Sequence, residues 1–344
     1  MPRSSTNRYR TFCLAVLLLC ALLAALFFLS FLIGSYPLGA KTVWDILTAS
    51  LRGLEPYWET AAWKVVFQVR IPRILLAVLV GGGLAVSGAS YQTLFKNPMV
   101  SPDILGVSAG AGFGAALAML RDGSWGEIQF SALAFGLLAV AAAYFIASVC
   151  GRTEVTTLVL AGVVVSNLFQ ALLSVVKTYA DTDSQLPSIT FWLMGSLGKG
   201  DMQDAGTLLP VTLACLLVLF LFRHQIDVLS TGEEEAMSLG VNVRLVSLLV
   251  ILSATLMTVV SVSICGIIGW VGLVVPHISR MFAGAKFSRL MVLSFLIGGF
   301  FLLLMDNIIR GVGSVELPLG VLTALAGTPV FAVLLVRSRR RTLG

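Results

Sequence analysis

Few side chains in this sequence have the types and spacing that catalysis needs. The two histidines, His224 and His277, lie far apart, and no H-E-x-x-H, G-x-S-x-G or G-x-x-x-x-G-K-[ST] pattern occurs. The five cysteines lie singly in or beside apolar runs without C-x-x-C spacing, which is typical of small buried hydrophobic side chains. The sequence therefore predicts no catalytic residue, no metal site and no cofactor, and any ATP-driven step would need a separate protein.

Charged residues are the remaining candidates, and they lie near the ends of apolar runs. Arg70 and Arg73 precede one run, while Asp306 and Arg310 lie four residues apart at the end of another, where their charges could pair. No apolar run carries a carboxylate at its centre, which disfavours a proton-driven secondary transporter. Backbone carbonyls at broken helices can bind Na⁺, so a stand-alone secondary transporter stays an alternative.

The composition is that of an integral membrane protein. Of the 344 residues, 58% are hydrophobic and 12% are charged. Soluble domains hold about 45–50% apolar and about 25% charged residues. This balance excludes a disordered chain, a nucleic-acid-binding domain of the usual charged type and a disulfide-stapled secreted fold.

The apolar runs predict an all-α protein with about ten membrane-spanning helices in a single domain, residues 1–344. A bilayer core of about 30 Å needs about 20 apolar residues per helix. The charge-free stretch 245–279 would be about 52 Å long as one helix, so it must fold back, and Gly266 and Gly269 mark the expected break. The predicted spans cover residues 11–33, 74–95, 104–120, 128–150, 155–177, 205–222, 245–265, 266–282, 289–309 and 317–337.

An even number of spans places both termini on one side of the membrane, and the basic residues indicate which side. With a cytoplasmic N-terminus, most Lys and Arg lie inside and most Asp and Glu lie outside, as the positive-inside rule requires. The net charge of +6 is therefore explained by membrane topology. We expect contact with the lipid bilayer and no nucleic-acid partner.

Glycines are clustered within the predicted spans. Gly106, Gly110 and Gly114 repeat every four residues, and Gly83 and Ser87 have the same spacing. Small residues four apart line one face of a helix and let backbones approach closely in lipid. We expect both faces to be helix–helix contacts.

Several motifs are too dense to be ordinary membrane-spanning sequence. They are Arg70-Ile-Pro-Arg73, Asn97-Pro98, Phe191-Trp192-x-Met194-Gly195-Ser196, Gly232-x-x-x-Ala236-x-x-Leu239-Gly240, Val271-Gly272-Leu273-Val-x-Pro276-His277-Ile-x-Arg280, Asp306-x-x-x-Arg310 and Pro318-x-Gly320-x-x-Thr323. With these motifs the chain resembles the FecCD/BtuC-like permease subunits of type II ABC importers for iron–siderophore, haem and cobalamin. The resemblance runs from about Arg70 to Phe331 and implies ten helices per subunit.

The resemblance implies a docking role for three arginines. In similar permeases, arginines at the positions of Arg70, Arg73 and Arg310 meet carboxylates on the substrate-binding protein. A guanidinium group suits this role because it stays charged and pairs with a carboxylate through two hydrogen bonds. The alternatives are anchoring at the membrane surface and, for Arg310, pairing with Asp306.

The resemblance also implies a coupling segment within residues 223–243, the longest polar cytoplasmic stretch. In similar permeases a short helix here sits in a cleft of the ATPase. The coupling residues would be Gly232, Glu233, Ala236, Leu239 and Gly240. The glutamates that begin this helix favour its positive end, and we expect Ala236 and Leu239, three apart, to form a small apolar face for the partner.

A gate and an entrance complete the implied sites. The turn around Asn97 and Pro98 resembles the family's cytoplasmic gate, and a tight helix–helix connection is the alternative. Asp181, Thr182 and Asp183 could line the periplasmic mouth or form a solvated turn. We expect Trp192 to anchor the chain at the membrane surface, and a substrate contact is the alternative.

Taken with the resemblance, these features predict the permease subunit of a binding-protein-dependent ABC importer in the cell inner membrane. Its cargo would be an iron(III)–siderophore or a similar metal chelate, with cobalamin, haem or molybdate as alternatives. Its partners would be two copies of an ABC ATPase subunit, a periplasmic or lipid-anchored substrate-binding protein, and a second permease copy or a paralogue. ATP hydrolysis would belong to the ATPase, so the chain itself is not expected to be an enzyme.

Overall fold

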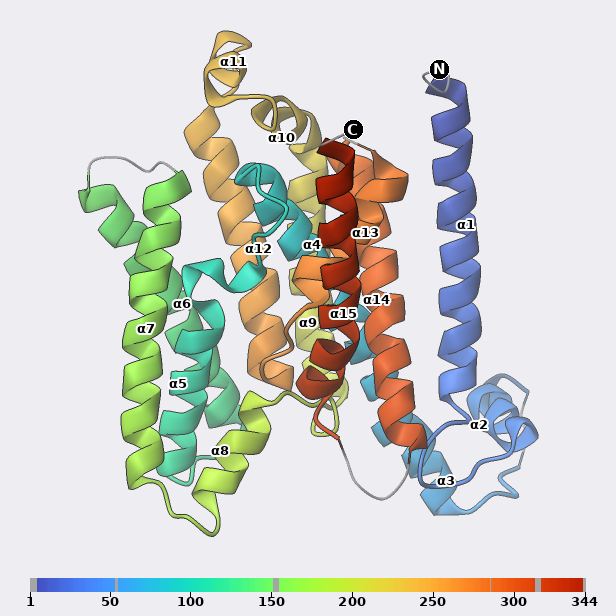
Figure 1. Cartoon of the computed structure of the whole chain (residues 1–344). Helices are drawn as coiled ribbons and strands as arrows, with labels where there is room; N and C mark the ends of the chain where they lie inside the picture. The colour runs from blue at the N-terminus through green and yellow to red at the C-terminus, as the bar shows by residue number, and fades with distance from the viewer. Residues whose placement is uncertain (1–4, 53–54, 151–154, 285, 313–316, 343–344) are drawn as a thin grey trace.

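The structure, a computed structural model, describes residues 5–52, 55–150, 155–284, 286–312 and 317–342. The other positions of the expected domain 1–344 lie outside the described residues. Throughout the described ranges the regular structure is helical. Most elements are long helices packed side by side, and short helices join them at the two ends of the bundle (Figure 1).

Seven described segments are long and apolar enough to cross a membrane. Six of them are the helices α1 (Ser5–Ser30), α6 (Trp125–Val149), α7 (Val155–Tyr179), α9 (Met202–Leu221), α12 (Val243–Cys265) and α14 (Phe287–Gly311). The seventh runs continuously through α3 (Thr60–Lys64), the π-helix η1 (Val65–Arg70) and α4 (Ile71–Leu94). It begins well before residue 74, where the expected span starts. The charged side chains that precede residue 74 do not interrupt the helix, because they leave backbone hydrogen bonding intact.

Three shorter apolar helices occupy further ranges at which we expect spans. They are α5 (Val107–Leu120), α13 (Val271–Ala283) and α15 (Leu319–Thr342), the last apolar over Leu319–Leu334. Of the helices that do not span, α2 (Ala40–Arg52) and α8 (Gln185–Leu193) lie at one end of the bundle, and α10 (Arg223–Leu229) and α11 (Glu233–Ser238) at the other (Figure 1). A 3-10 turn, η2 (Pro102–Leu105), precedes α5. A total of ten spans stays a prediction.

The first and last described helical turns lie at the same end of the bundle. The start of α1 and the last turn of α15 are at the end of the molecule where α11 lies, hereafter the α11 end (Figure 1). The helices α2, α3 and α8 lie at the opposite end, hereafter the α8 end. The predicted even number of spans requires such a placement.

The charge-free stretch 245–279 is divided where glycine allows it. Helix α12 ends at Cys265 and α13 begins at Val271. Gly266 between them has φ +71°, and a Cβ there would lie 2.1 Å from the carbonyl oxygen of Trp192. A side chain would be both strained and blocked at this position, so the chain turns back here.

Helix α4 is the central helix of the bundle. It packs against α9, α12, α13 and α14, and nearly all of its residues are buried. A Cβ at Gly88 would lie 1.8 Å from the carbonyl oxygen of Gly272 in α13, and one at Gly81 would lie 2.3 Å from that of Gly298 in α14. The helices therefore touch backbone to backbone at these glycines.

The expected small-residue faces are confirmed with one correction. Gly110 and Gly114 face α6, where an added Cβ would lie 2.4 Å from the carbonyl oxygens of Phe135 and Ser131. Gly106 does not belong to this face, since it precedes α5 with φ +85° and is closest to Ser166 of α7.

Gly83 and Ser87 both face α12. A Cβ added at Gly83 would find Ser261 as its nearest neighbour, and the Ser87 hydroxyl donates a hydrogen bond to the carbonyl oxygen of Ala254 (3.0 Å). This face of α4 is therefore a helix–helix contact, as expected.

Candidate functional site

The three arginines come together at the α8 end of the bundle. Arg70, Arg73 and Arg310 line a small cavity of about 240 Å³, hereafter the arginine pocket, together with Tyr36 and Val69. No carboxylate belongs to the lining of this pocket among the residues that the structure describes. Residues far apart in the sequence thus form one cationic site.

Inside the fold, two of these arginines pair with Asp306. Asp306 is fully buried and forms ion pairs with Arg73 (2.8 Å) and Arg310 (3.0 Å). The expected pairing of Asp306 with Arg310 is therefore confirmed. The 2.8 Å contact with Arg73 joins α4 to α14 and could not be read from sequence spacing.

The same arginines hold the end of α1. Arg310 donates hydrogen bonds to the carbonyl oxygens of Ser30 and Ile33 (both 3.1 Å), and Arg70 donates to those of Phe31 and Tyr36. The carbonyls at a helix C-terminus lack partners within the helix, and cations there are favourable. The structure thus gives the arginines an internal role, and docking of a binding protein stays a prediction.

The coupling segment forms α10 and α11 at the α11 end. Gly232 precedes α11, Glu233 is in its first turn, and Gly240 follows it with φ +79°. The expectation that Ala236 and Leu239 share one apolar surface is wrong, because Ala236 is fully buried whereas Leu239 is 69% exposed. The exposed apolar surface of this segment consists of Leu239 and Met237, which is 58% exposed.

The gate turn is tied to α13 by a residue whose role the sequence did not reveal. The side chain of Gln92 donates to the carbonyl oxygens of Val100 (3.2 Å) and Leu273 (3.3 Å). Asn97 and Pro98 are exposed in the turn itself, where the Asn97 side chain accepts the N–H of Met99 (2.9 Å). In the sequence, this role was indicated by the polar amide of Gln92, which lies four residues before the turn on a buried face of α4.

Residues 181–183 form a structured turn before α8. The Asp181 carboxylate accepts hydrogen bonds from the hydroxyl (2.7 Å) and the N–H (2.8 Å) of Ser184 and from the N–H of Asp183. These bonds, that from the Ser184 hydroxyl first, hold the pKa of Asp181 below its usual range. All three residues, Thr182 included, are exposed, and their place at an entrance stays a prediction.

The prediction that Trp192 is a surface anchor is wrong. Only 7% of Trp192 is exposed, because it belongs to a buried apolar cluster with residues of α5, α7 and α12. The segment after α8 is in addition bound to two distant parts of the chain. The N–H of Ser196 donates to the carbonyl oxygen of Cys265 (2.8 Å), and the N–H of Gly320 donates to that of Met194 (2.9 Å). These bonds join α8, α12 and α15.

A hollow of about 630 Å³, hereafter the α15 hollow, lies beside this junction. Its lining is largely apolar and includes Met194, Ile267, Trp270, Val321 and Leu325. Trp270 has φ +71°, a backbone conformation that bulky residues rarely adopt and that often marks functional positions. In the sequence, the unusual conformation of Trp270 was indicated only by its place in the expected break after residue 265.

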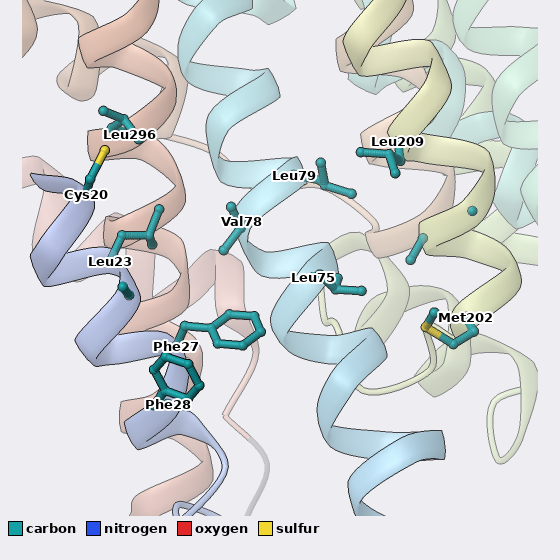
Figure 2. A pocket seen from close by; sticks show the side chains of 13 residues that line it. Cys20, Leu23, Phe27, Phe28, Leu75, Val78, Leu79, Met202, Leu209 and Leu296 are labelled. Carbon is teal, nitrogen blue, oxygen red and sulfur yellow. The ribbon is translucent and has the colours of Figure 1, made fainter. Parts of the chain in front are cut away.

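A second apolar cavity has no side chain suited to catalysis in its described lining. It measures about 460 Å³ and lies between α1, α4, α9 and α14, with Phe27, Val78 and Leu209 among its lining (Figure 2). Within the described part of the chain no charged side chain borders it, and its lining is almost wholly apolar. We therefore do not assign a functional site to it.

Comparison with known proteins gives a consistent result. The FecCD transport family matches residues 22–337. The molybdate import system permease protein of Haemophilus influenzae is 38% identical over 308 residues, 90% of this chain and 91% of the relative. A probable iron chelatin transport permease of Helicobacter pylori is 37% identical over 277 residues, 80% of this chain and 83% of the relative. A solved structure of a metal-chelate type ABC transporter in an inward-facing conformation has a TM-score of 0.82 at 36% identity, covering 94% of this chain and 98% of the other.

Proposed function

Because the chain belongs to the FecCD transport family and is a multi-pass ABC importer permease, we propose that it carries an iron(III)–siderophore or a similar metal chelate across the cell inner membrane. The α11 end would then be cytoplasmic and the α8 end periplasmic. The ATPase would supply the energy, and a binding protein would supply the cargo.

One observation carries the proposal that the two partners dock at opposite ends. The α11 end presents Met237 and Leu239, two exposed apolar side chains within a polar segment, while the α8 end presents the arginine pocket. Exposed apolar side chains of this kind suit a protein partner, and we assign them to a cleft of the ATPase. A dimer of permeases would bind two ATPase copies.

Charge balance supports docking at the arginine pocket despite the internal contacts. Asp306 pairs with Arg73 and Arg310, Arg70 donates to backbone carbonyls, and all three guanidinium groups border a cavity whose described lining holds no carboxylate. A glutamate or aspartate of the binding protein would compensate this charge. Such charge-assisted contacts are strong when they are partly desolvated.

The proposed path for the cargo lies along the α15 hollow. Its apolar lining offers a bulky chelate little binding, which suits a conduit that must release what it receives. We propose that a second permease copy or a paralogue closes the other side of this path. The turn at Asn97 and Pro98, tied to α13 through Gln92, would then close its cytoplasmic end, and residues 181–183 would border its entrance.

The coupling surface can be tested by removing its apolar side chains. A Met237→Ser, Leu239→Ser double variant is expected to weaken ATPase binding about tenfold or more, since burying each of these apolar side chains in a partner's cleft contributes about 1.5–3 kcal/mol. Co-purification of the ATPase and ATP-dependent uptake in proteoliposomes would measure the loss. Glu234→Ser, on the same helix, serves as the control and should keep both. Equal behaviour of the two variants would contradict the assignment.

The cargo is tested by uptake in cells with and without the gene. We expect the deletion to abolish uptake of a radiolabelled iron(III)–siderophore, and depletion of ATP to abolish it in the parent cells. Unchanged siderophore uptake in the deletion, in cells that lack a redundant importer, would remove the iron assignment. Uptake that needs the gene but survives ATP depletion would instead indicate a secondary transporter.

Molybdate is the second candidate cargo. The observation that favours it is the 38% identity, over nine tenths of both chains, with the molybdate permease of Haemophilus influenzae. Radiolabelled molybdate in the same cells separates the two, because only one of the two uptakes should depend on the gene. Haem and cobalamin belong in the same panel.

A further inference from the structure

A groove of about 680 Å³ runs between α6, α9 and α12, apart from the sites described above. We propose that this groove, hereafter the lateral groove, binds one phospholipid from the leaflet at the α8 end, with a primary ammonium such as ethanolamine in its headgroup. The proposal concerns the outside of the bundle and does not depend on the cargo.

The lining of the lateral groove changes from polar to apolar along its length. Near the α8 end it is formed by Gln129, Asp201, Asp204 and Ser263, which lie close to the starts of α6 and α9 and to the end of α12. Deeper in the bundle it is lined by Leu133, Leu137, Val211, Ala214, Leu256 and Val260. A molecule that fills it must therefore have one polar and one apolar end.

The length of the groove matches one leaflet. On α6 its lining extends from Trp125 to Leu137, which is about 18 Å at about 1.5 Å per residue. Half of a hydrocarbon core is about 15 Å thick, so the groove reaches from the membrane surface to the middle of the bilayer. Phe130 at its edge is 72% exposed, which shows that the groove opens sideways from the bundle.

The polar end carries negative charge. Asp204 is 8% exposed and accepts hydrogen bonds from the side chain of Gln129 (2.8 Å) and the N–H of Asp201 (3.1 Å). One oxygen of Asp201 accepts the N–H of Asp204 (2.9 Å), and its second oxygen has no hydrogen bond within the described part of the chain. No Lys or Arg belongs to the described lining, so a cationic group is the complementary ligand.

A phosphate would find its partners beside this position. The indole N–H of Trp125, which borders the lateral groove, is buried without a hydrogen-bond partner among the described residues. The ammonium of Lys199 lies 5.1 Å from the centre of the Trp125 ring. A zwitterionic headgroup meets both requirements, with its ammonium at Asp201 and its phosphate toward Trp125 and Lys199. A choline headgroup cannot donate a hydrogen bond to Asp201, and a glycerol headgroup brings no positive charge.

Native mass spectrometry of the purified full-length permease tests the proposal. After delipidation, the protein is offered phosphatidylethanolamine, phosphatidylcholine and phosphatidylglycerol at equal concentrations. We expect one phosphatidylethanolamine to be retained, with about tenfold preference over either of the others, because a charge-assisted hydrogen bond distinguishes them. Retention of phosphatidylglycerol at an equal or higher level would overturn the headgroup assignment.

Two variants with matched controls test separately the part of the groove that would hold the lipid's acyl chains and the part that would hold its headgroup. Ala214→Trp fills the apolar end and should abolish retention, whereas Leu213→Trp, on the neighbouring 56% exposed position outside the groove, should not. Asp201→Asn keeps the helix cap but removes the charge, and should abolish the preference for phosphatidylethanolamine.

Glu127→Gln removes a carboxylate from the capping box at the start of α6 and should preserve that preference. Lipid retention by Ala214→Trp equal to that of Leu213→Trp would overturn the site. An unchanged preference in Asp201→Asn would overturn the headgroup contact, and this variant decides the question even where Ala214→Trp fails to fold.

Discussion

Replacement of Asp306 by asparagine is expected to destabilise the folded chain by about 3–5 kcal/mol, the cost of breaking a buried ion pair by removing one partner. Asp306 is fully buried and is the carboxylate to which both Arg73 and Arg310 are paired. Asparagine has nearly the same shape but no charge. Two buried guanidinium groups would then lose the carboxylate that they share, and the contact between α4, α14 and the end of α1 would loosen.

Thermal unfolding of the purified permease in detergent measures this effect, followed by intrinsic tryptophan fluorescence. The matched control is Arg52→Gln, which breaks the ion pair between Arg52 and Asp45 (3.1 Å). The Arg52 side chain is 51% exposed, so this change should cost no more than about 1 kcal/mol. Equal melting temperatures for the two variants would show that the Asp306 cluster does not stabilise the fold.

Replacement of Gly88 by alanine should have the second large effect. The new Cβ would lie 1.8 Å from the carbonyl oxygen of Gly272, a backbone atom that cannot rotate away. Overpacking of this kind costs about 1–3 kcal/mol or more, because the two helices must separate. The separation would also move α13 away from Gln92, whose amide donates to the carbonyl oxygen of Leu273, and so disturb the gate turn.

A matched glycine on another helix provides the control. Gly206 lies in α9, and a Cβ there would meet nothing within 4 Å. Gly206→Ala should therefore leave the melting temperature unchanged or raise it slightly, since alanine favours a helix by about 0.5–1 kcal/mol over glycine. Comparable destabilisation by both substitutions would contradict the contact at Gly88 and assign the loss to helix flexibility instead.

Glycine contacts that repeat within one helix can be predicted from the sequence, whereas the partner of a glycine on a distant helix cannot. Gly110 and Gly114 were predicted to face a neighbouring helix because their spacing repeats within one segment, and they do. The contact of Gly81 with Gly298 joins helices more than 200 residues apart in the sequence. No local pattern in either segment indicates which partner it meets.

Contacts of the functional residues were likewise predictable within one helix but not between distant helices. The pairing of Asp306 with Arg310 is set by one helical turn and was predicted, whereas the ion pair of Arg73 with Asp306 spans 233 residues and was not. Spacing along α11 suggested a shared surface for Ala236 and Leu239, but Ala236 packs inward. The motif around Trp192 marked an important segment without showing that its ring is buried.

The sequence by itself determined that this is an all-helical membrane protein of the FecCD family, where most of its helices lie, and that the stretch 245–279 must turn back on itself. Helix length and hydropathy are local properties, so they can be read along the chain. Only the tertiary structure decided which face of each helix is buried, which charges meet in the arginine pocket, and that a polar-to-apolar groove lies between α6, α9 and α12. These features depend on the relative positions of helices distant in sequence, which close packing of the whole bundle sets.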